Sequence, residues 1–450
     1  MSYNDLMTYD DREMISDIVE SGACDLHLHT HYSDGADSVV SLVQKVMASK
    51  LKCFAVADHD CIDAIPETLR LLKRLRELGF VCPEFIPGIE ISAEFGDAGH
   101  SKEIHILGYF PHGRYEEMAG FVNEQRRKRN ERNVEMCKCL TALGMPVTIE
   151  ELNSQGQKSI GRLHAANILM RKGYISSVKE GFDTLFGYGR PCYVMRDKPD
   201  AALAVSTIRN AGGSAVIAHP YLYKWTGPGD GIVSETLALA LKSLKEAGIC
   251  GAEAFHGEAS PEQREETYAA ALSAGLIPTA GSDYHGDNKD GVRMFGSGSV
   301  FIEKDAVFEA AVIIECDGKY LVMESDELTC SGKKTFMPCT AVPLRGSTDP
   351  DARIRKYIKE RFADNLEVTE HYITAYGRQE GQRHILTAYK TIVKSDAEEL
   401  LRCAGEGRAG FKGLQDLMTC DMPDAHTAVI RSIREIPLCT DFHHLNTSGV

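Results

Sequence analysis

The amino-acid sequence predicts an α/β protein: a parallel sheet or barrel, interrupted by a helical insertion and followed by a second α/β domain. Three observations support this prediction. In the first third of the chain, short apolar runs alternate with amphipathic helical patterns, which is typical of a parallel sheet or barrel. From about residue 114 to residue 192 the strand pattern is missing, and it then resumes. After Glu303 the order changes again, to strands joined by short turns.

Each element is expected from its periodicity and length. The first domain should contain strands at residues 23–29, 53–57, 85–91, 103–109, 214–218, 251–255 and 277–281. Its helices should cover residues 39–47, 65–77, 201–211 and 235–247. In the C-terminal domain we expect strands at residues 307–315, 320–325, 335–342, 371–376 and 384–393, with a helix at 351–362. The resulting division is an N-terminal segment (1–22), a barrel (23–111 and 193–303), an insertion (112–192), a C-terminal domain (304–440) and a tail (441–450).

Composition restricts the class of protein. The chain has 450 residues, of which 43% are hydrophobic and 26% charged, as in ordinary globular proteins. It opens on polar and acidic residues and has no apolar run of about 18 residues, so we expect no membrane segment and a cytoplasmic location. The net charge of −15 argues against broad binding of duplex DNA. Fourteen scattered cysteines without a secretory signal predict reduced thiols.

Histidines and carboxylates recur where apolar strands are expected to end. His27 and His29 are two residues apart, so their side chains share one face of a strand. In barrels of this kind, functional residues collect at the carboxyl ends of strands. We therefore expect one metal-binding cluster formed by His27, His29, Asp34, His59, Glu90, His105, His219, Asp283 and His285. Mixed imidazole and carboxylate ligands suit Mn, Zn or Fe, and Mg is also compatible.

The motifs around these residues resemble those of the PHP (polymerase and histidinol phosphatase) family over about residues 23–303. They are Asp25-Leu-His-Leu-His-Thr-His-Tyr-Ser-Asp-Gly35, Asp58-His-Asp60, Gly88-Ile-Glu-Ile-Ser92, Ala218-His-Pro220 and Gly281-Ser-Asp-Tyr-His285. The resemblance implies a distorted (β/α)7 barrel that holds two or three divalent metal ions. It also implies three ligand sets: His27, His29, Glu90 and Asp283; Glu90, His105 and His219; and Asp34, His59 and His285.

The predicted chemistry is hydrolysis of a phosphate ester. Three carboxylates and two or three divalent ions leave the site positive, and such ions lower the pKa of a bound water. The candidate catalytic residues are Glu90, which would bridge two ions, and His59 and His285, which are candidates for protonating the leaving oxygen.

The insertion carries a basic segment, Glu124-Gln-Arg-Arg-Lys-Arg-Asn-Glu-Arg132. A solvated, salt-bridged helix surface would explain it without any ligand. However, Ile160-Gly-Arg-Leu-His-Ala-Ala166, Lys172-Gly-Tyr-Ile175 and Tyr188-Gly-Arg-Pro191 resemble the insertion of the TrpH/YciV-like phosphoesterases within the PHP family, with Leu163 where Pro is more usual. That resemblance implies nucleotide substrates: 3',5'-bisphosphates or short 5'-phosphorylated oligonucleotides degraded from the 5' end. Arg129, Arg132 and Arg162 are the candidate phosphate-binding residues.

The C-terminal domain resembles a degenerate Nudix domain. Residues 310–325 and Phe336-Met-Pro-Cys-Thr-Ala-Val342 resemble its opening, and a helix ending at Phe362 falls where the Nudix helix should be. That helix normally carries several Mg²⁺-binding glutamates, of which only Glu360 is present. We expect a regulatory, ligand-sensing or dimerising domain rather than a hydrolase, through which the chain could form a homo-oligomer.

Two alternatives to a nucleotide phosphoesterase stay open. One is a phosphatase for another small phosphomonoester such as histidinol phosphate. The other is a non-catalytic PHP scaffold or nucleotide sensor, against which the complete set of ligand-type side chains argues.

Overall fold

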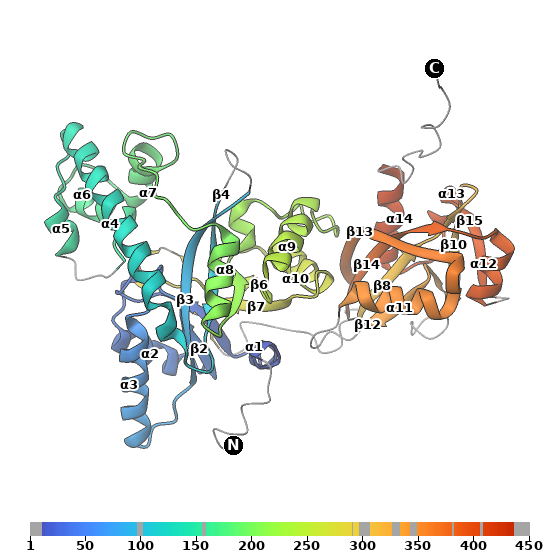
Figure 1. Ribbon diagram of the computed structural model, residues 1–450, viewed down its shortest axis with the longest axis horizontal. Coiled ribbons are helices and arrows are strands. Elements are labelled where there is room, and N and C mark those ends of the chain that lie inside the picture. Colours follow the sequence, from blue (N-terminus) through green and yellow to red (C-terminus); the bar gives the residue numbers. More distant parts are fainter. Residues whose placement is uncertain are drawn as a thin grey trace. The chain divides into compact units, whose positions relative to one another are not determined.

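A seven-stranded, nearly closed sheet is the framework of the N-terminal part in the computed structural model (Figure 1). The described residues are 11–96, 102–154, 159–289, 291–296, 307–325, 334–342, 349–379, 382–405 and 408–435. The chain divides into two compact units. The first holds Met1–Trp225, Ala240–Tyr268 and Leu276–Ile302, and the second holds Thr226–Leu239, Ala269–Gly275 and Glu303–Val450.

The strands of the large sheet follow one another in chain order. They are β1 (Cys24–Leu28), β2 (Cys53–Val56), β3 (Glu84–Phe95), β4 (Lys102–Tyr109), β5 (Ser214–Ile217), β6 (Gly251–His256) and β7 (Ile277–Gly281). The chain segments that continue β1 and β7 meet, since the His29 N–H donates to the Tyr284 carbonyl at 3.0 Å and the Asp283 N–H to the His27 carbonyl at 2.9 Å. The predicted α/β barrel class is therefore confirmed.

One strand departs from a wholly parallel arrangement. β4 pairs antiparallel with both β3 and β5, whereas the other neighbouring pairs in this sheet are parallel. Only six residues separate β3 from β4, too few for the crossover that a parallel connection requires. The alternation of strands and helices therefore stops at β3.

The helices of this part begin with α1 (Asp11–Glu20), which the sequence analysis missed. The others are α2 (Val39–Ala48), α3 (Ala64–Glu77), α8 (Ala201–Asn210), α9 (Glu235–Ala247) and α10 (Pro261–Ser273). α2 shows why they form: Val39, Leu42, Val43 and Val46 make one buried stripe at helical spacing. The Ser38 side chain caps the helix by accepting from the Ser41 N–H.

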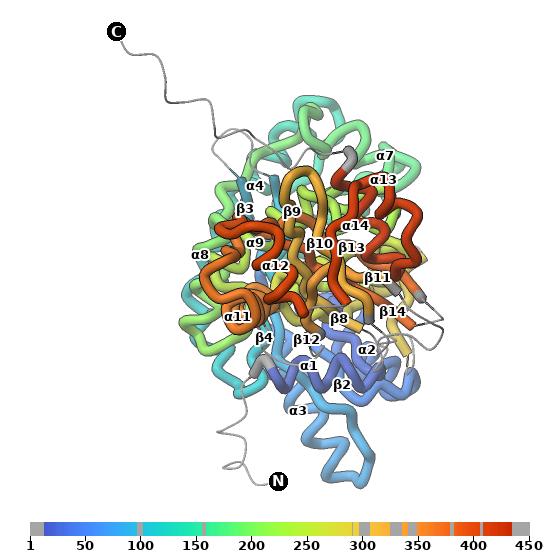
Figure 2. The backbone as a smooth tube through the Cα atoms, turned by 90° about the vertical axis from the view of Figure 1, so that its right-hand side faces the viewer, coloured from blue at the N-terminus to red at the C-terminus, as the bar shows by residue number. Residues whose placement is uncertain are grey.

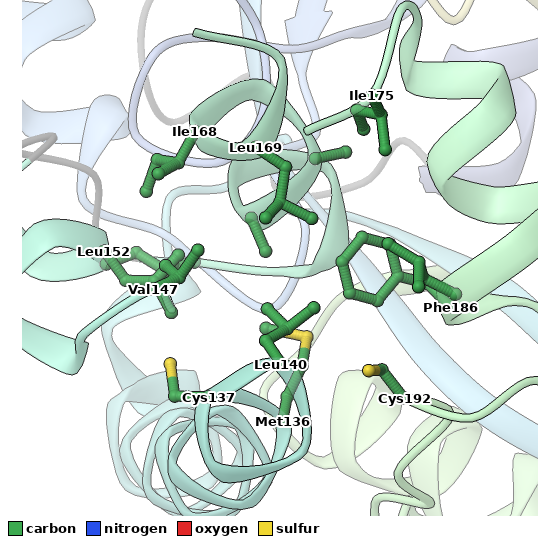
Figure 3. Packing of buried hydrophobic residues seen from close by; sticks show 14 residues of the cluster. Met136, Cys137, Leu140, Val147, Leu152, Ile168, Leu169, Ile175, Phe186 and Cys192 are labelled. Carbon is green, nitrogen blue, oxygen red and sulfur yellow. The ribbon is translucent and has the colours of Figure 1, made fainter. Parts of the chain in front are cut away.

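The insertion consists of the long helix α4 (Ala119–Ala142) and the shorter α5 (Ile149–Asn153), α6 (Arg162–Arg171) and α7 (Val178–Gly181), which gather near one end of α4 (Figure 1). It has a small core of its own (Figure 3), in which Met136 and Leu140 of α4 face Leu169 and Phe186. Burying such side chains stabilises the insertion by about 1.5–3 kcal/mol for each. The insertion is thus a packed subdomain.

The second unit contains two four-stranded sheets, whose strands run from yellow to red in Figure 2. The strands are β8 (Val307–Ile313), β9 (Glu315–Cys316), β10 (Lys319–Ser325), β11 (Lys334–Phe336), β12 (Cys339–Val342), β13 (Leu366–Gln379), β14 (Gln382–Val393) and β15 (Ala409–Gly413). The helices are α11 (Pro350–Phe362), α12 (Ala397–Ala404), α13 (Leu414–Leu417) and α14 (Asp424–Glu435). The expected single strand at residues 335–342 is wrong. It is split into β11 and β12, which belong to different sheets, and Pro338 between them lacks an N–H to donate.

A hydrophobic core of this unit joins α14 to the sheet β12-β8-β14-β13, through Val429, Ile430, Leu386 and Ala375 among others. The unit is α/β, as expected, and its Nudix-like assignment stays a prediction. Across the described residues no helix has the length and apolar character needed to cross a membrane. The described cysteines form no disulfide.

Candidate metal centre and substrate pocket

The barrel strands bring all nine predicted ligands into one cluster. His29, His59, His219 and the pair Asp283 and His285 follow the ends of β1, β2, β5 and β7. The expectation that nearly every ligand follows a strand end is wrong for three residues: His27, Glu90 and His105 lie within β1, β3 and β4.

Strand geometry explains two of these exceptions. β2 pairs with β3 only as far as Pro87, so Glu90 already lies beyond the carboxyl end of β2. There the backbone of Glu90 forms an isolated β-bridge with that of His59. β4 runs in the opposite direction, so its first half, with His105, lies at the edge where the parallel strands end. Only the antiparallel pairing, which the sequence analysis did not anticipate, puts His105 beside Glu90.

The first group is His27, His29, Glu90 and Asp283, four buried side chains whose ligand atoms lie within 4.8 Å of one another. Nε2 of His27 is 3.3 Å from Glu90 Oε2 and 3.5 Å from Asp283 Oδ1. Nε2 of His29 is 3.3 Å and 3.2 Å from the same two oxygens. The two imidazole nitrogens and two carboxylate oxygens thus face a common centre.

The second group lies on the other oxygen of Glu90. His105 Nδ1 is 2.8 Å and His219 Nε2 is 3.0 Å from Glu90 Oε1. His59 lies between the two groups: its Nδ1 is 2.8 Å from Glu90 Oε2, the oxygen that faces the first group, and it also forms a potential ligand set with Glu90 and His105. Glu90 therefore has one oxygen toward each of two groups, the arrangement expected of a carboxylate that bridges two ions.

The third group surrounds Asp34. His285 Nε2 is 3.2 Å from Asp34 Oδ1, and His59 Nε2 is 3.6 Å from Asp34 Oδ2. His29 belongs here too, because its Nδ1 is 3.7 Å from Asp34 Oδ1.

Unsatisfied polar atoms at the centre fit bound cations. His27 Nε2, His29 Nε2, His59 Nδ1, Asp34 Oδ1 and Glu90 Oε2 are buried and make no hydrogen bond. Buried polar atoms ordinarily find a partner, because leaving them unpaired is costly. A metal ion is the partner that satisfies imidazole nitrogens and carboxylate oxygens at once, so these residues fit a divalent metal.

Two opposing effects act on the pKa values of the histidines in the cluster: burial lowers them, and nearby carboxylates raise them. Desolvation would lower the pKa of His29, but Asp283 and Glu90 outweigh it and raise that pKa to about 9. Desolvation is likewise outweighed at His105, chiefly by Glu90, and its pKa rises to about 10. At His219 desolvation prevails and lowers the pKa to about 4. In the polypeptide alone, protons on some imidazoles balance the carboxylates, and a divalent ion would take over that role.

Three residues in or next to the cluster have strained backbone conformations. His219, Asp283 and Asp60 adopt left-handed backbone conformations, with φ of 31°, 56° and 47°. Such residues cost about 1–3 kcal/mol each and tend to occur at functional sites. The strain turns the side chains that follow β5 and β7 into the cluster.

Residues behind the cluster, which the sequence analysis missed, hold the ligands in place. Glu253 of β6 lies with Oε1 3.0 Å from His27 Nδ1 and accepts the His219 N–H at 2.8 Å. The Tyr223 hydroxyl lies 3.0 Å from His219 Nδ1. Such partners fix the orientation of ligating imidazoles. The sequence feature that could have identified Glu253 is a glutamate within the otherwise apolar segment Gly251–Phe255.

A cavity of about 140 Å³ adjoins the cluster and is lined by Asp34, His59 and His105 on that side. The facing wall carries the three predicted arginines: Arg129 and Arg132 of α4, and Arg162 at the start of α6. Arg196 and Lys198 line it as well and were missed. Their signal was a pair of cations in Arg196-Asp-Lys198, directly after the insertion.

One part of the basic segment of α4 is a solvated helix surface, and another part faces the cavity. Arg127 is exposed and pairs with Glu124 and Glu131 on the helix surface, as a solvated face would. Arg129 and Arg132 turn inward instead, with side-chain exposure of 12% for Arg129 and with Arg132 buried.

Asp60 anchors this wall. Its buried carboxylate accepts from Arg129 and, at 2.8 Å, from Arg196 Nη1, while its other oxygen accepts the Ser92 N–H. Burial raises the pKa of Asp60, but the two guanidinium groups prevail and hold it well below the ordinary range. Arg132 donates through Nε to Asn133 Oδ1 at 3.0 Å and pairs with no carboxylate of the described residues; desolvation, then Arg129 and Arg162, push its pKa well below the ordinary value.

Comparison with known proteins identifies relatives of the barrel and the insertion. A family model described as PHP domain matches residues 25–159. The chain is 30% identical over 261 residues to a 5'-3' exoribonuclease of Haemophilus influenzae, covering 58% of this chain and 89% of that relative. It is 28% identical over 270 residues to a 3',5'-nucleoside bisphosphate phosphatase of Chromobacterium violaceum, covering 59% and 88%. A solved structure of an amidohydrolase from Chromobacterium violaceum, with bound sulfate and no metal, superposes with a TM-score of 0.51 at 26% identity, over 61% of this chain and 92% of the other.

Proposed function

The chain belongs to the PHP family, and from this membership we propose that it is a metal-dependent phosphoesterase that hydrolyses nucleotide phosphates. The substrates would be 3',5'-nucleoside bisphosphates, 5'-phosphorylated oligonucleotides, or both, as the names of two relatives suggest. One observation carries the proposal: a cluster of nine ligand-type side chains opens directly onto a cavity with five cationic side chains.

We infer that the cluster holds two or three divalent ions, of Mn, Zn or Fe, with Mg also compatible. Bound there, such ions would lower the pKa of a water molecule and neutralise charge on the phosphate. Glu90 fits a bridging role, because its two oxygens face different groups of histidines.

The other steps fall to the chain's own residues. Arg129, Arg132 and Arg162 are proposed to bind phosphate oxygens and so orient the ester toward the cluster. His59 is the better candidate for protonating the leaving oxygen, because it lines the cavity and its side chain is 17% exposed. His285, at 8%, is more enclosed and suits a ligand role.

An assay of the purified chain with Mn²⁺ tests the proposal. The substrates are adenosine 3',5'-bisphosphate, AMP, histidinol phosphate and a 5'-phosphorylated RNA. We expect release of phosphate from the bisphosphate or of mononucleotides from the RNA. His29→Ala and Asp283→Ala should remain folded by circular dichroism and lose activity by at least about a thousandfold, because each removes a ligand of the first group.

Two controls make the outcome decisive. Tyr174→Ala, an exposed residue outside the cavity, should keep full activity. Turnover of histidinol phosphate alone would contradict the nucleotide assignment. Full activity after either ligand substitution would contradict the metal mechanism, and a metal-free, inactive but folded chain would support the scaffold alternative.

A further inference from the structure

Three aromatic residues of the insertion, Phe182, Tyr188 and Tyr193, form what we call the aromatic rim. Phe182 and Tyr193 line the same cavity as the five cations. The Tyr188 ring lies edge to face with that of Tyr193, with centroids 5.4 Å apart. Nothing in the metal cluster or in the phosphate-binding role uses these rings.

One ring of the rim, that of Tyr188, is exposed, whereas Phe182 and Tyr193 are half-buried. Tyr188 is 88% exposed, against 40% for Tyr174 of the same insertion. A protein gains nothing in stability from a tyrosine in water, and exposed aromatic groups next to a polar pocket commonly mark binding sites. The Tyr188 ring is therefore available to a ligand that enters the cavity.

The rim is held in place by the insertion's packed core. Phe182 packs against that core, and Phe186 is buried within it (Figure 3). Residues Phe182–Phe186 form a π-helical turn, a rare conformation that is frequent at functional sites. A Cβ on Gly187 would lie 2.6 Å from the Phe182 carbonyl oxygen, so only glycine permits this close turn. The rings are thus presented by a rigid support.

A cation already lies beside two of the rings. The Arg162 guanidinium carbon is 6.0 Å from the Phe182 ring centroid and 5.8 Å from that of Tyr193. A guanidinium that binds phosphate next to an aromatic face suits a ligand with a charged end and a flat apolar end. Phosphate monoesters of amino alcohols have no flat ring system of the size of a base, whereas nucleotides have both parts.

We propose that the aromatic rim stacks against a nucleobase of the substrate while the arginines hold its phosphates, an inference that rests on the proposed hydrolysis of nucleotide phosphates. Stacking on aromatic side chains tolerates any base, because every base presents a π-face. The rim therefore selects for the presence of a base rather than for its identity.

Equilibrium binding to the full Mn²⁺-loaded chain tests the proposal without depending on turnover. AMP and ribose 5-phosphate differ only by the base. We expect AMP to bind on the order of tenfold more tightly, because one stacked base contributes about that factor. Tyr188→Ala and Tyr193→Ala should each reduce this ratio several-fold, and Tyr188→Ala, whose ring does not contact Arg162, should leave the affinity for ribose 5-phosphate unchanged.

Matched variants separate stacking from structural damage. Tyr188→Phe keeps the ring and should keep the ratio. Tyr174→Ala removes an exposed tyrosine from the same insertion, outside the cavity, and should also keep it. Because Tyr188 is nearly fully exposed, its removal should not affect folding.

The outcomes distinguish this inference from the proposed function. An AMP preference that is absent, or that survives both alanine substitutions, overturns the rim's role even if the chain hydrolyses nucleotides. A rim-dependent preference in a chain that hydrolyses no nucleotide phosphate supports the rim and overturns the proposed function instead. If Tyr188→Ala changes the sedimentation of the chain and not the preference, the rim is a contact between copies, and the stacking proposal is wrong.

Discussion

At the scale of single residues, the arginines that line the cavity show a conflict between the stability of the fold and the binding of a substrate. Arg129 and Arg196 share the carboxylate of Asp60, whereas Arg132 is 7% exposed and lies among other arginines. Its Nε donates to Asn133 Oδ1 at 3.0 Å, but it forms no ion pair with a carboxylate of the described residues, and a buried guanidinium in this position is costly unless an anion joins it. The phosphate group of the proposed substrate would supply such an anion beside Arg132.

Replacing Arg132 with Met should stabilise the substrate-free chain and weaken its binding of substrate. We expect the free energy of unfolding to rise by about 1–2 kcal/mol, since desolvation and repulsion disappear. The KM for a nucleoside bisphosphate should rise on the order of tenfold, because a charge-assisted contact to phosphate is lost. Calorimetry and steady-state kinetics measure the two effects.

Arg127→Met is the matched control on the same helix, because Arg127 is exposed and pairs only on the helix surface. It should change neither quantity appreciably. An Arg132→Met protein that is less stable and has an unchanged KM would show that this side chain supports packing rather than substrate.

At the scale of elements, the close approach of β7 to β1 shapes the metal cluster. Gly281, the last residue of β7, lies against His27 of β1 and against Glu253 of β6, so closely that a Cβ at this position would collide with both. His27 is a predicted ligand, and Glu253 orients it. Only glycine lets the three strands meet at this distance.

Gly281→Ala should therefore damage the site rather than the whole fold. We expect reduced metal content and a loss of activity of at least about a hundredfold, because displacement of a ligand or of the residue that orients it has effects of this size. Metal analysis of the purified protein, together with kinetics, checks this. Gly120→Ala in α4, where a Cβ meets nothing within 4 Å, is the control and should be neutral or slightly stabilising. Normal metal content in Gly281→Ala would contradict the steric argument.

The predicted and observed elements together show which features of a fold can be predicted from a sequence pattern. The expected helix at residues 235–247 and strand at 277–281 were predicted with their observed bounds, because each shows one clear periodicity. The reversal of β4 and the split into β11 and β12 were not predicted. Strand direction and sheet membership depend on pairing partners, which local periodicity does not specify.

At the scale of the whole molecule, a buried carboxyl group outside the metal cluster makes the stability of the fold depend on pH. In the second unit, Glu309 of β8 is buried beneath α14, with Oε2 3.4 Å from His426 Nε2. Burial raises the pKa of Glu309, but the contact with His426 outweighs it and the pKa is lowered. A lowered folded-state pKa stabilises the protein above the ordinary pKa of glutamate, about 4.3. This stabilisation is lost as the pH falls through the folded-state pKa.

Glu309→Gln should thus destabilise the chain by about 1–3 kcal/mol at pH 7, since the charged partner of His426 is lost. The difference from the unsubstituted chain should begin to shrink below about pH 4.3 and vanish once the pH has fallen through the lowered folded-state pKa, because the carboxyl is then protonated in both states. Thermal unfolding as a function of pH measures it. Glu360→Gln on the exposed face of α11 should show little change at any pH. A difference that is constant across pH would mean that packing, not charge, explains the effect.

The sequence by itself determined the α/β class, most element positions and the nine ligand-type residues, because these depend on local periodicity and on the chemistry of single side chains. The tertiary structure decided how those residues are grouped: Glu90 between two sets of histidines, His105 beside it through a reversed strand, and Glu253 behind His27. It also decided that Arg129 and Arg132 face a cavity while Arg127 faces solvent, although all three belong to one basic segment. The physical reason is that distance between residues far apart in the chain, and the burial of each face of a helix, arise only when strands pair and helices pack.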